Sequence, residues 1–301
     1  MHDRILCGYW FGWPPRIMFR DIPLEYNVVC VAFLAPELYG YPSFAAFGVP
    51  SFTPIGMSDQ EFRAGIELLK SQGRIVLISL GGSHHGISIT TADKQRLKDE
   101  ILRVVNLYGF MGIDINLEGA SITAAENRTI IPAVLREIKD SFHSQGRPFF
   151  ITLAPEFHAL RGYDALYKPY LIDLEGYYDL VYPQFYNHGD DGIWSDKYQI
   201  YLSQNDDAHK AEFLYTLSHA IVTGTSNFQR IPPDKFAIGL PASRDAALNG
   251  YVVDPSDVMW ALDRLALEGN AIRGLMTWSI NHDMANGFQF VNRFAPMMVY
   301  R

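Results

Sequence analysis

The chain is poor in cysteine, in long apolar runs and in clustered positive charge. Its 301 residues include two cysteines, Cys7 and Cys30, each within an apolar segment. We expect buried free thiols, with a disulfide between neighbouring strands as the alternative. No window approaches the roughly 18 apolar residues of a transmembrane helix, so we expect no membrane-spanning segment. The net charge is −8 and no run of Lys or Arg occurs, which argues against nucleic acid as a partner.

Motifs of nucleotide and metal chemistry are also missing. The segment after the first predicted strand, "GYWFGWPP", lacks G-x-G-x-x-G, and no Walker lysine motif occurs. Without H-E-x-x-H or C-x-x-C, we expect neither a metal nor a cofactor. The N-terminal "MHDRILCGYW" has no basic region followed by a long apolar stretch, so no signal peptide is visible. The location stays open: secreted if a leader was removed, and cytoplasmic otherwise.

What the chain has instead is an alternation of strand and helix signals from end to end. Eight apolar runs are predicted as strands: 5–10, 27–34, 74–80, 111–117, 149–154, 180–185, 236–240 and 275–280. Eight strands alternating with helices over this length predict a (β/α)8 barrel, a TIM barrel, as a single domain over residues 1–301. A doubly wound parallel sheet shares the alternation, but it usually carries the Gly-rich loop that is absent here.

Capping patterns predict where the helices begin and end. Ser58-x-x-Glu61 and Thr123-x-x-Glu126 both fit the capping box, which satisfies free amides at a helix start. Asp254-Pro255 predicts a helix with proline at its first position. We expect helices to end near four glycines, Gly73, Gly109, Gly146 and Gly269. A stripe of apolar residues predicts one helix with a buried face: Leu97, Ile101, Val104, Val105 and Tyr108.

The fourth predicted strand carries polar residues on a face that would otherwise be apolar. In "GFMGIDINLEGA" Asp114, Asn116 and Glu118 occupy alternate positions, about 7 Å apart, so their side chains point the same way. Burying them costs stability. Catalytic groups of a barrel stand at the C-terminal ends of its strands, where Glu118 falls. The alternative is a polar layer inside the barrel, held by hydrogen bonds alone.

This segment resembles the D-x-x-D-x-D-x-E signature of glycoside hydrolase family 18, the chitinases and their relatives. Other segments resemble motifs of that family in the same order: "LISLGG" (77–82), "ITLAPE" (151–156), "YPQFYN" (182–187), "GLPAS" (239–243) and "GLMTWSINHD" (274–283). The resemblance covers nearly the whole chain. It implies hydrolysis of β-1,4 bonds between N-acetylglucosamine units, with chitin or its oligosaccharides as the partner and a monomeric protein.

The resemblance also implies roles for individual residues. In this family the N-acetyl oxygen of the substrate attacks the anomeric carbon, so a single protonated acid suffices. By match, Glu118 is the general acid and later the base, and Tyr186 holds the acetamido carbonyl. Trp278 stacks under the sugar at the cleavage position. A supporting network and further substrate contacts are implied for Asp114, Ser79, Tyr9, Gln184, Asn187, Glu156 and Phe33.

The chain departs from the signature at two positions. Met111 stands at the first aspartate, and Asn116 stands at the aspartate next to the acid. That aspartate normally accepts the acetamide N–H, offsets the positive charge of the intermediate and raises the pKa of the acid. Asparagine keeps an acceptor but supplies no charge, so we expect a chitinase slowed by Asn116. Two alternatives stay open: a lectin-like protein that binds chito-oligosaccharides without cleaving them, and an endo-β-N-acetylglucosaminidase acting on N-glycans.

The spacing after the seventh predicted strand limits the shape of the cleft. That strand ends near Leu240 and the next helix starts near Asp254. About a dozen residues cannot hold the α+β subdomain that walls a deep tunnel in some family members. The implied cleft is shallow and open, which favours cleavage inside a sugar chain over processive cleavage from an end.

Overall fold

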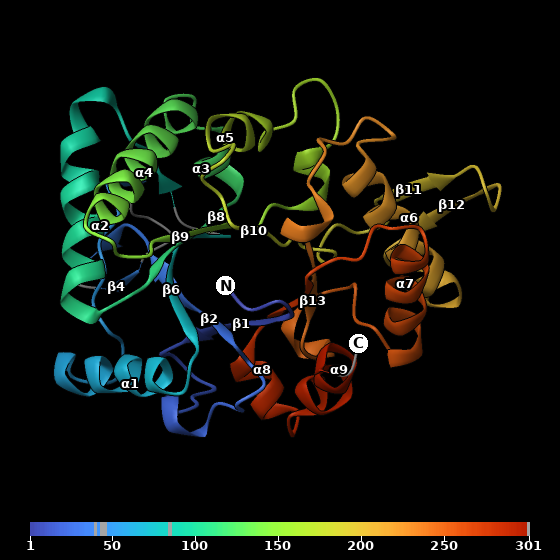
Figure 1. Cartoon of the computed structure of the whole chain (residues 1–301), viewed down its shortest axis with the longest axis horizontal. Helices are drawn as coiled ribbons and strands as arrows, with labels where there is room; N and C mark the ends of the chain where they lie inside the picture. Colours follow the sequence, from blue (N-terminus) through green and yellow to red (C-terminus); the bar gives the residue numbers. More distant parts are fainter. Residues whose placement is uncertain (39–40, 43–46, 84–85, 300–301) are drawn as a thin grey trace.

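Eight parallel strands form a nearly closed barrel at the centre of the molecule, a computed structural model that describes residues 1–38, 41–42, 47–83 and 86–299 (Figure 1). Isolated bridges from Val181 to Phe236 and from Gln184 to Gly239 connect the two ends of the sheet. Each strand pairs with its neighbours along the chain, as in a (β/α)8 barrel, so the predicted fold is confirmed. Around the ring the strands are β10 (Leu180–Val181), β9 (Phe150–Leu153), β8 (Gly112–Leu117), β6 (Ile75–Gly82), β2 (Val28–Leu34), β1 (Ile5–Phe11), β14 (Gly274–Trp278) and β13 (Ala237–Pro241).

Helices surround this barrel on its outside, as Figure 1 shows. They are α1 (Asp59–Ser71), α2 (Lys94–Tyr108), α3 (Gly119–Thr123), α4 (Asn127–Ser144), α5 (Lys168–Asp173), α6 (Lys210–Thr223), α7 (Pro255–Leu267), α8 (Ile280–Ala285) and α9 (Gln289–Val299). Short pairs of strands lie outside the barrel: β3 (Glu37–Leu38) with β4 (Tyr41–Pro42), and β5 (Phe47–Gly48) with β7 (Gly86–Ile87). Within the described residues, no helix is both long and apolar enough to cross a bilayer.

Most of the predicted helix boundaries are confirmed. Ser58 and Glu61 form the expected capping box at the start of α1, and Asp254 caps α7 by accepting the N–H of Ser256. The five stripe residues are the buried residues of α2, which ends at Gly109 with φ of +81°. Such a left-handed position favours glycine. The other three predicted glycines lie just beyond the ends of α1, α4 and α7.

The second predicted capping box is wrong. Thr123 is the last residue of α3 rather than a cap, and its hydroxyl donates to the carbonyls of Gly119 and Ala120. Glu126 instead accepts the N–H and the hydroxyl of Thr91, both at 3.0 Å. The helix that follows starts at Asn127 without a side-chain cap.

Two strand predictions extend too far. The expected strand 180–185 is regular only over Leu180–Val181, and Pro183 cannot donate to a ladder. Beyond it the segment keeps single bridges from Gln184 to Glu156 and to Gly239. The expected strand 275–280 ends at Trp278, because Ser279 caps helix α8 by accepting the N–H of His282.

The two faces of each barrel strand enter different apolar clusters. In β8, Ile113, Ile115 and Leu117 point outward into the core shared with the helices, while Asp114 and Asn116 point into the barrel. Lower in the barrel the interior is apolar and includes Cys7 and Cys30, whose sulfurs lie 3.7 Å apart as free thiols. The polar residues therefore lie between this apolar part of the interior and the C-terminal end of the barrel.

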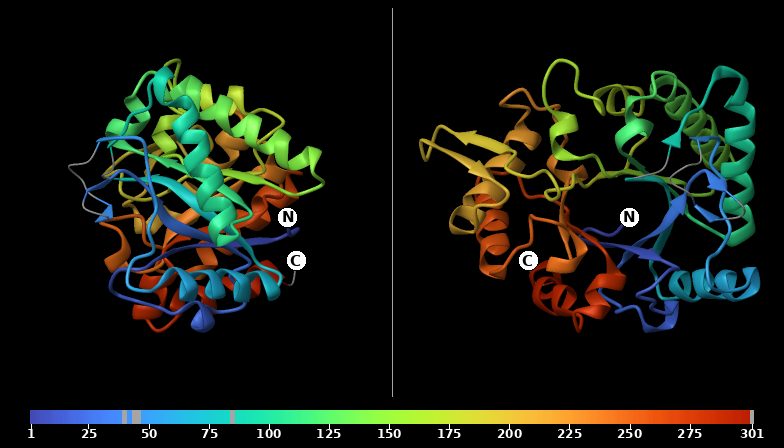
Figure 2. Two further views of the ribbon diagram at one scale, coloured as in Figure 1. Left: turned by 90° about the vertical axis from the view of Figure 1, so that its left-hand side faces the viewer. Right: turned by 180° about the vertical axis from the view of Figure 1, so that it is seen from behind.

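Connections at the C-terminal rim leave the barrel mouth without an α+β subdomain after β13. Between β13 and α7 the chain forms a single short 3-10 turn, Arg244–Ala246. A hairpin that the sequence did not predict, β11 (Gly192–Ser195) with β12 (Ile200–Ser203), follows β10 instead. Figure 2 shows this hairpin projecting away from the barrel.

Candidate active site

A buried carboxylate, Asp114, organises the polar layer inside the barrel. Strand register places Ser79 and Thr152 beside it on the neighbouring strands β6 and β9. Its Oδ2 accepts from the hydroxyls of Tyr9 at 2.7 Å and Ser79 at 2.6 Å. Its Oδ1 accepts from Thr152 at 2.7 Å and Tyr182 at 2.6 Å. Five side chains from β1, β6, β8, β9 and the segment after β10 are thereby held in fixed positions.

Burial raises the pKa of Asp114, while these hydroxyl hydrogen bonds oppose the rise. The hydroxyls of Thr152 and Tyr182 also lie 2.5 Å from each other, so these two groups and Asp114 Oδ1 make three mutual contacts. Two hydroxyls supply only two protons for those three contacts. With both hydroxyls donating to Asp114, the short contact between Thr152 and Tyr182 is left without a proton of its own.

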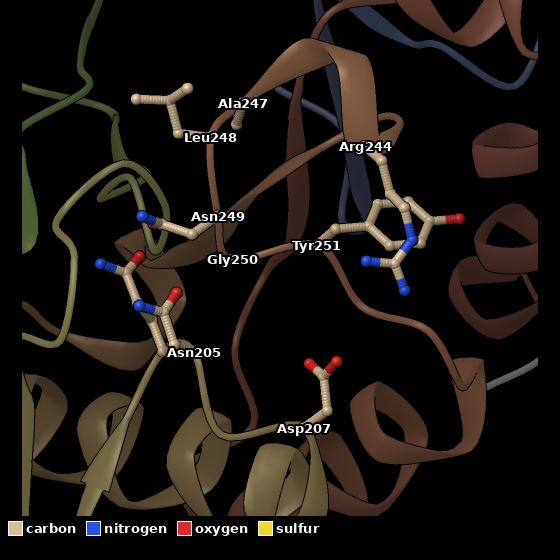
Figure 3. Close-up of a pocket in the computed structure, with 9 residues that line it drawn as sticks. Asn205, Asp207, Arg244, Ala247, Leu248, Asn249, Gly250 and Tyr251 are labelled. Atoms are coloured by element: carbon tan, nitrogen blue, oxygen red, sulfur yellow. The ribbon is translucent and has the colours of Figure 1, made fainter.

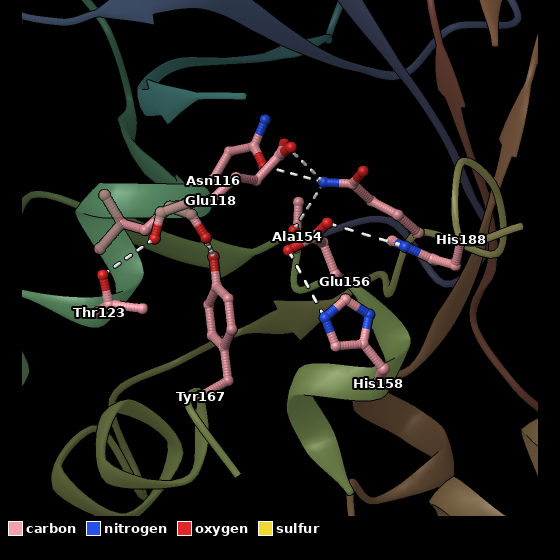
Figure 4. Close-up of polar contacts among 11 residues, drawn as sticks. Asn116, Glu118, Thr123, Ala154, Glu156, His158, Tyr167 and His188 are labelled. Carbon is pink, nitrogen blue, oxygen red and sulfur yellow. Dashed lines mark hydrogen bonds and ion pairs between the residues drawn. The ribbon is translucent and has the colours of Figure 1, made fainter. Parts of the chain in front are cut away.

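Gln184 links the two polar residues above Asp114. Its Nε2 lies 3.0 Å from Asn116 Oδ1, 3.0 Å from Glu118 Oε1 and 3.1 Å from the carbonyl oxygen of Ala154, and its two hydrogens are shared among these three acceptors. Asn116 and Glu118, both labelled in Figure 4, thus share one hydrogen-bond donor. The predicted residues Asn116, Glu118 and Gln184 therefore form one connected group, directly above the buried network.

Glu118 directly follows the last residue of β8, Leu117, whose backbone groups are hydrogen-bonded by the side chain of Tyr167. The Tyr167 hydroxyl accepts the N–H of Leu117 at 2.7 Å and donates to the Leu117 carbonyl at 2.9 Å. Burial raises the pKa of Glu118 from 4.5 to about 7, the hydrogen bond from Gln184 opposes this, and the charge of Glu156 adds to it. A carboxyl group with such a pKa can hold and release a proton near neutral pH.

An aromatic cluster lies near the C-terminal ends of strands β1, β2 and β14. The Trp278 ring stacks on Phe33, with centroids 5.8 Å apart and planes inclined by 12°. Tyr9 and Phe11 lie 5.5 Å and 5.7 Å from Trp278 by ring centroid. Trp278 stays partly exposed although its neighbours are buried. The predicted residues Trp278, Phe33 and Tyr9 thus meet in one aromatic cluster, in which Trp278 is the ring that stays partly exposed.

Tyr186 and Asn187, which are adjacent in sequence, have different surroundings. Tyr186 is buried, and burial together with the charge of Glu118 raises its pKa well above the ordinary value. No described residue hydrogen-bonds its hydroxyl, which leaves it free to donate to a ligand. Asn187 is exposed, and its Oδ1 accepts the N–H of Leu248 at 2.8 Å. Its carbonyl oxygen therefore holds the loop 247–251 against this segment.

Glu156 follows β9 at the same rim and lies between two histidines. Its Oε1 is 3.7 Å from His188 Nδ1, and its Oε2 is 3.9 Å from His158 Nε2. Burial raises the pKa of Glu156 and lowers the pKa of His188 to about 4. His188 is therefore a neutral imidazole at neutral pH.

A separate hollow of about 270 Å³ lies between the segment 204–207, which follows β12, and the loop 247–251. Figure 3 shows its lining, in which the Arg244 guanidinium lies over the Tyr251 ring, 5.2 Å from its centroid. None of the predicted site residues lines it. Gly250, with φ of +88°, lets this loop approach Tyr186, because a Cβ there would lie 2.6 Å from the Phe185 carbonyl oxygen.

Sequence reasoning missed Thr152, Tyr182 and Tyr167 as parts of this site. Thr152 and Tyr182 both lie inside segments that carried the family resemblance, "ITLAPE" and "YPQFYN". Their inward direction follows from the register of β8, β9 and β10, in which Asp114 pairs with Thr152 and Thr152 with Leu180. Tyr167 lies in no motif, and no pattern in the sequence points to it.

No protein-family model matches the chain, but several curated relatives that resemble it are named chitinases. The chain is 42% identical to a chitinase of Enterococcus faecalis over 97% of its own length and 86% of that protein. It is 31% identical to chitinase Chi52 of Paenibacillus xylanexedens over 97% of its length, and spans 61% of that protein. A solved family GH18 chitinase from Chromobacterium violaceum superposes with a TM-score of 0.80 and 26% identity, over 99% of this chain and 84% of that one.

Proposed function

Because the chain belongs to glycoside hydrolase family 18, the chitinases and their relatives, we propose that it hydrolyses β-1,4 bonds of chitin oligosaccharides with retention of configuration. The observation that carries this proposal is Glu118, a carboxyl group with a pKa raised to about 7 at the barrel mouth. Trp278 offers an aromatic face to a sugar beside it. The proposal concerns the activity of the described barrel, since one of the two relatives above extends well beyond it.

In the first step, the protonated Glu118 gives its proton to the bridging oxygen as the bond from that oxygen to the anomeric carbon breaks. The carbonyl oxygen of the N-acetyl group attacks the anomeric carbon in the same step and forms a cyclic, positively charged intermediate. A second enzyme carboxylate is then unnecessary as the nucleophile. Tyr186 supports this step, because its hydroxyl is unused by described residues and can donate to the acetamido carbonyl.

In the second step, the same carboxylate acts as a base. Glu118 takes a proton from water as the water oxygen bonds to the anomeric carbon, and the acetamido oxygen leaves. The substrate regains its N-acetyl group, and Glu118 regains its proton for the next cycle. A pKa near neutrality serves both steps, because the acid must lose its proton in one step and recover it in the other.

Asn116 is proposed to slow this cycle. Its Oδ1 accepts from Gln184 and retains a second lone pair for the acetamide N–H of the substrate. It carries no negative charge to balance the positive intermediate. Loss of a charge-assisted contact of this kind costs about 2–4 kcal/mol in the transition state.

A lectin-like protein that binds chito-oligosaccharides without hydrolysing them is the second candidate. The neutral side chain of Asn116 favours it, because the intermediate is then less stabilised. The presence of Glu118, Tyr186 and Trp278 together favours the enzyme. An endo-β-N-acetylglucosaminidase on N-glycans would use the same chemistry with another substrate, and no described side chain discriminates against it.

Product analysis separates these candidates. We propose incubating the protein with chitopentaose, and separately with an N-glycan that has a chitobiose core, followed by mass spectrometry. Shorter chito-oligosaccharides are the expected products. Intact chitopentaose that nevertheless binds in a calorimetric titration would support the lectin instead. Cleavage of the N-glycan but not of chitopentaose would support the endoglycosidase.

A further inference from the structure

Two histidines and a glutamate bring three metal-ligating atoms together at the barrel rim. Glu156 follows β9, His158 lies in the 3-10 turn Phe157–Leu160, and His188 follows the segment after β10. One ligand atom from each lies within 4.8 Å of the others. Figure 4 shows the Glu156 carboxylate pointing at both imidazoles. The three residues come from two separate parts of the chain, and the barrel fold is what places them together.

The distances within this cluster are too long for direct hydrogen bonds. Glu156 Oε1 lies 3.7 Å from His188 Nδ1, and Glu156 Oε2 lies 3.9 Å from His158 Nε2. Hydrogen bonds between such atoms are about 2.7–3.2 Å long. The carboxylate therefore faces both rings across a gap. Among the described residues, no Lys or Arg forms an ion pair with Glu156.

The gap has the size that a small divalent cation needs. Three ligand atoms that are no more than 4.8 Å apart all lie within about 2.8 Å of one central point. This radius is 4.8 Å divided by the square root of three. Zinc binds imidazole nitrogen and carboxylate oxygen at about 2.0–2.2 Å, which places neighbouring ligands roughly 3.4 Å apart in a tetrahedron. Each ligand atom would have to move inward by less than about 1 Å.

The cluster is also largely preformed. The His188 side chain is only 5% exposed and packs edge-on against Phe157 and His158, with ring centroids 5.0 Å and 4.8 Å away. Nδ1 is the ring nitrogen that faces Glu156, so this packing sets the direction of the nitrogen that would bind the metal. Fixing a ligand before binding lowers the entropic cost of binding. The His158 side chain, 42% exposed, leaves an open path to solvent.

We propose that Glu156, His158 and His188 form a binding site for Zn²⁺ at the rim of the barrel. Two imidazoles and one carboxylate match the ligand set that zinc takes when one coordination position stays open to water. Mg²⁺ and Ca²⁺ prefer oxygen ligands, so two imidazoles disfavour them.

Calorimetric titration of the metal-free protein with Zn²⁺ at neutral pH tests this site. We expect saturable binding of one ion per chain, and no saturable binding of Mg²⁺ under the same conditions. His158→Gln and Glu156→Gln should each weaken Zn²⁺ binding at least tenfold, because loss of outer partners of a metal ligand alone costs about 10–100-fold. Since His158 is partly exposed, the first variant should fold normally, and circular dichroism checks this.

A matched control is the pair of His219 and Glu268 on the outer surface. Its Nε2–Oε2 distance, 3.8 Å, is close to those in the cluster, but the pair lacks a second imidazole. His219→Gln should bind Zn²⁺ like the wild type. The proposal is overturned if the wild type shows no saturable Zn²⁺ binding, if Mg²⁺ binds equally well, or if folded His158→Gln or Glu156→Gln binds as tightly as the wild type. None of these measurements depends on sugar hydrolysis.

Discussion

At the scale of single residues, the protonation state of Glu118 sets the expected pH dependence. The proposed first step needs the protonated acid, whose pKa is raised to about 7 by burial. The protonated fraction is therefore high below that pH and falls about tenfold for each pH unit above it. We predict that kcat/KM for chitopentaose falls as the pH rises through about 7. Steady-state rates across the pH range test this, and a decline centred near the ordinary glutamate pKa of 4.5 would contradict it.

Asn116→Asp tests whether the neutral amide limits the rate. A carboxylate there would stabilise the positive intermediate by about 2–4 kcal/mol, which corresponds to a roughly 30-fold to 1000-fold faster rate. The added negative charge would also raise the pKa of Glu118, so the decline of kcat/KM should move to higher pH. The measurement is kcat and the pH profile of both proteins on chitopentaose. An unchanged or lower rate would mean that Asn116 is adapted to its present role.

Alternation along one strand was enough to predict the direction of Asp114 and Asn116, because a strand has only two faces. The partners of Asp114 were only partly predictable. Tyr9 and Ser79 were implied by the family resemblance, whereas Thr152 and Tyr182 depend on strand register, which a sequence does not display. The family resemblance implied Asn187 as a substrate contact, which stays a prediction; in the structure its Oδ1 accepts the N–H of Leu248. The cluster of Glu156, His158 and His188 matches no spacing motif, because the turn after β9 and the segment after β10 meet only in the barrel.

At the scale of secondary-structure elements, the two predicted capping boxes make a matched pair. Ser58 accepts the N–H of Glu61 and Glu61 accepts the N–H of Ser58, whereas Thr123 caps nothing. We predict that Ser58→Ala lowers the free energy of unfolding by about 0.5–2 kcal/mol. Thr123→Ala, at an exposed position, should change it by less than about 0.5 kcal/mol. Urea denaturation of both variants measures the difference, and equal losses would contradict the assignment.

The two strand predictions that ran too far share a cause. Apolar residues continue past Val181 and past Trp278, so the composition still looks like a strand. Pro183 lacks an N–H for the ladder, and Ser279 offers an oxygen to the first turn of α8. At the end of a strand the backbone groups stop pairing with the neighbouring strand. The number of apolar residues alone therefore does not show where the strand ends.

At the scale of the whole molecule, the barrel was predictable because eight strand signals alternate with helix signals along one chain. The ring is closed by the bridges from Val181 to Phe236 and from Gln184 to Gly239. These bridges join residues that are far apart in the sequence, so no local sequence pattern predicts them. The hairpin of β11 and β12 was not predicted. It is inserted between β10 and α6, so it does not follow the alternation of barrel strands and helices.

The connection between β13 and α7 carries a functional prediction. It contains only a short 3-10 turn, so no α+β subdomain walls the cleft there. We predict that chitohexaose is cut at several internal bonds, giving products of mixed length from the earliest time points. Chromatography of early products with one labelled chain end measures this. Release of disaccharide alone from the start would indicate cleavage from a chain end and contradict an open cleft.

The central claim is that Glu118 delivers the proton that breaks the sugar bond. The most direct measurement compares Glu118→Gln with the wild type on chitopentaose, recording single-turnover hydrolysis and equilibrium binding on the same preparations. Glu67→Gln, which alters an exposed carboxylate paired with Lys70, serves as the control. We predict that Glu118→Gln slows hydrolysis by about 100-fold to 10,000-fold while oligosaccharide binding persists, and that the control retains full activity. Hydrolysis by Glu118→Gln at the wild-type rate would contradict the account.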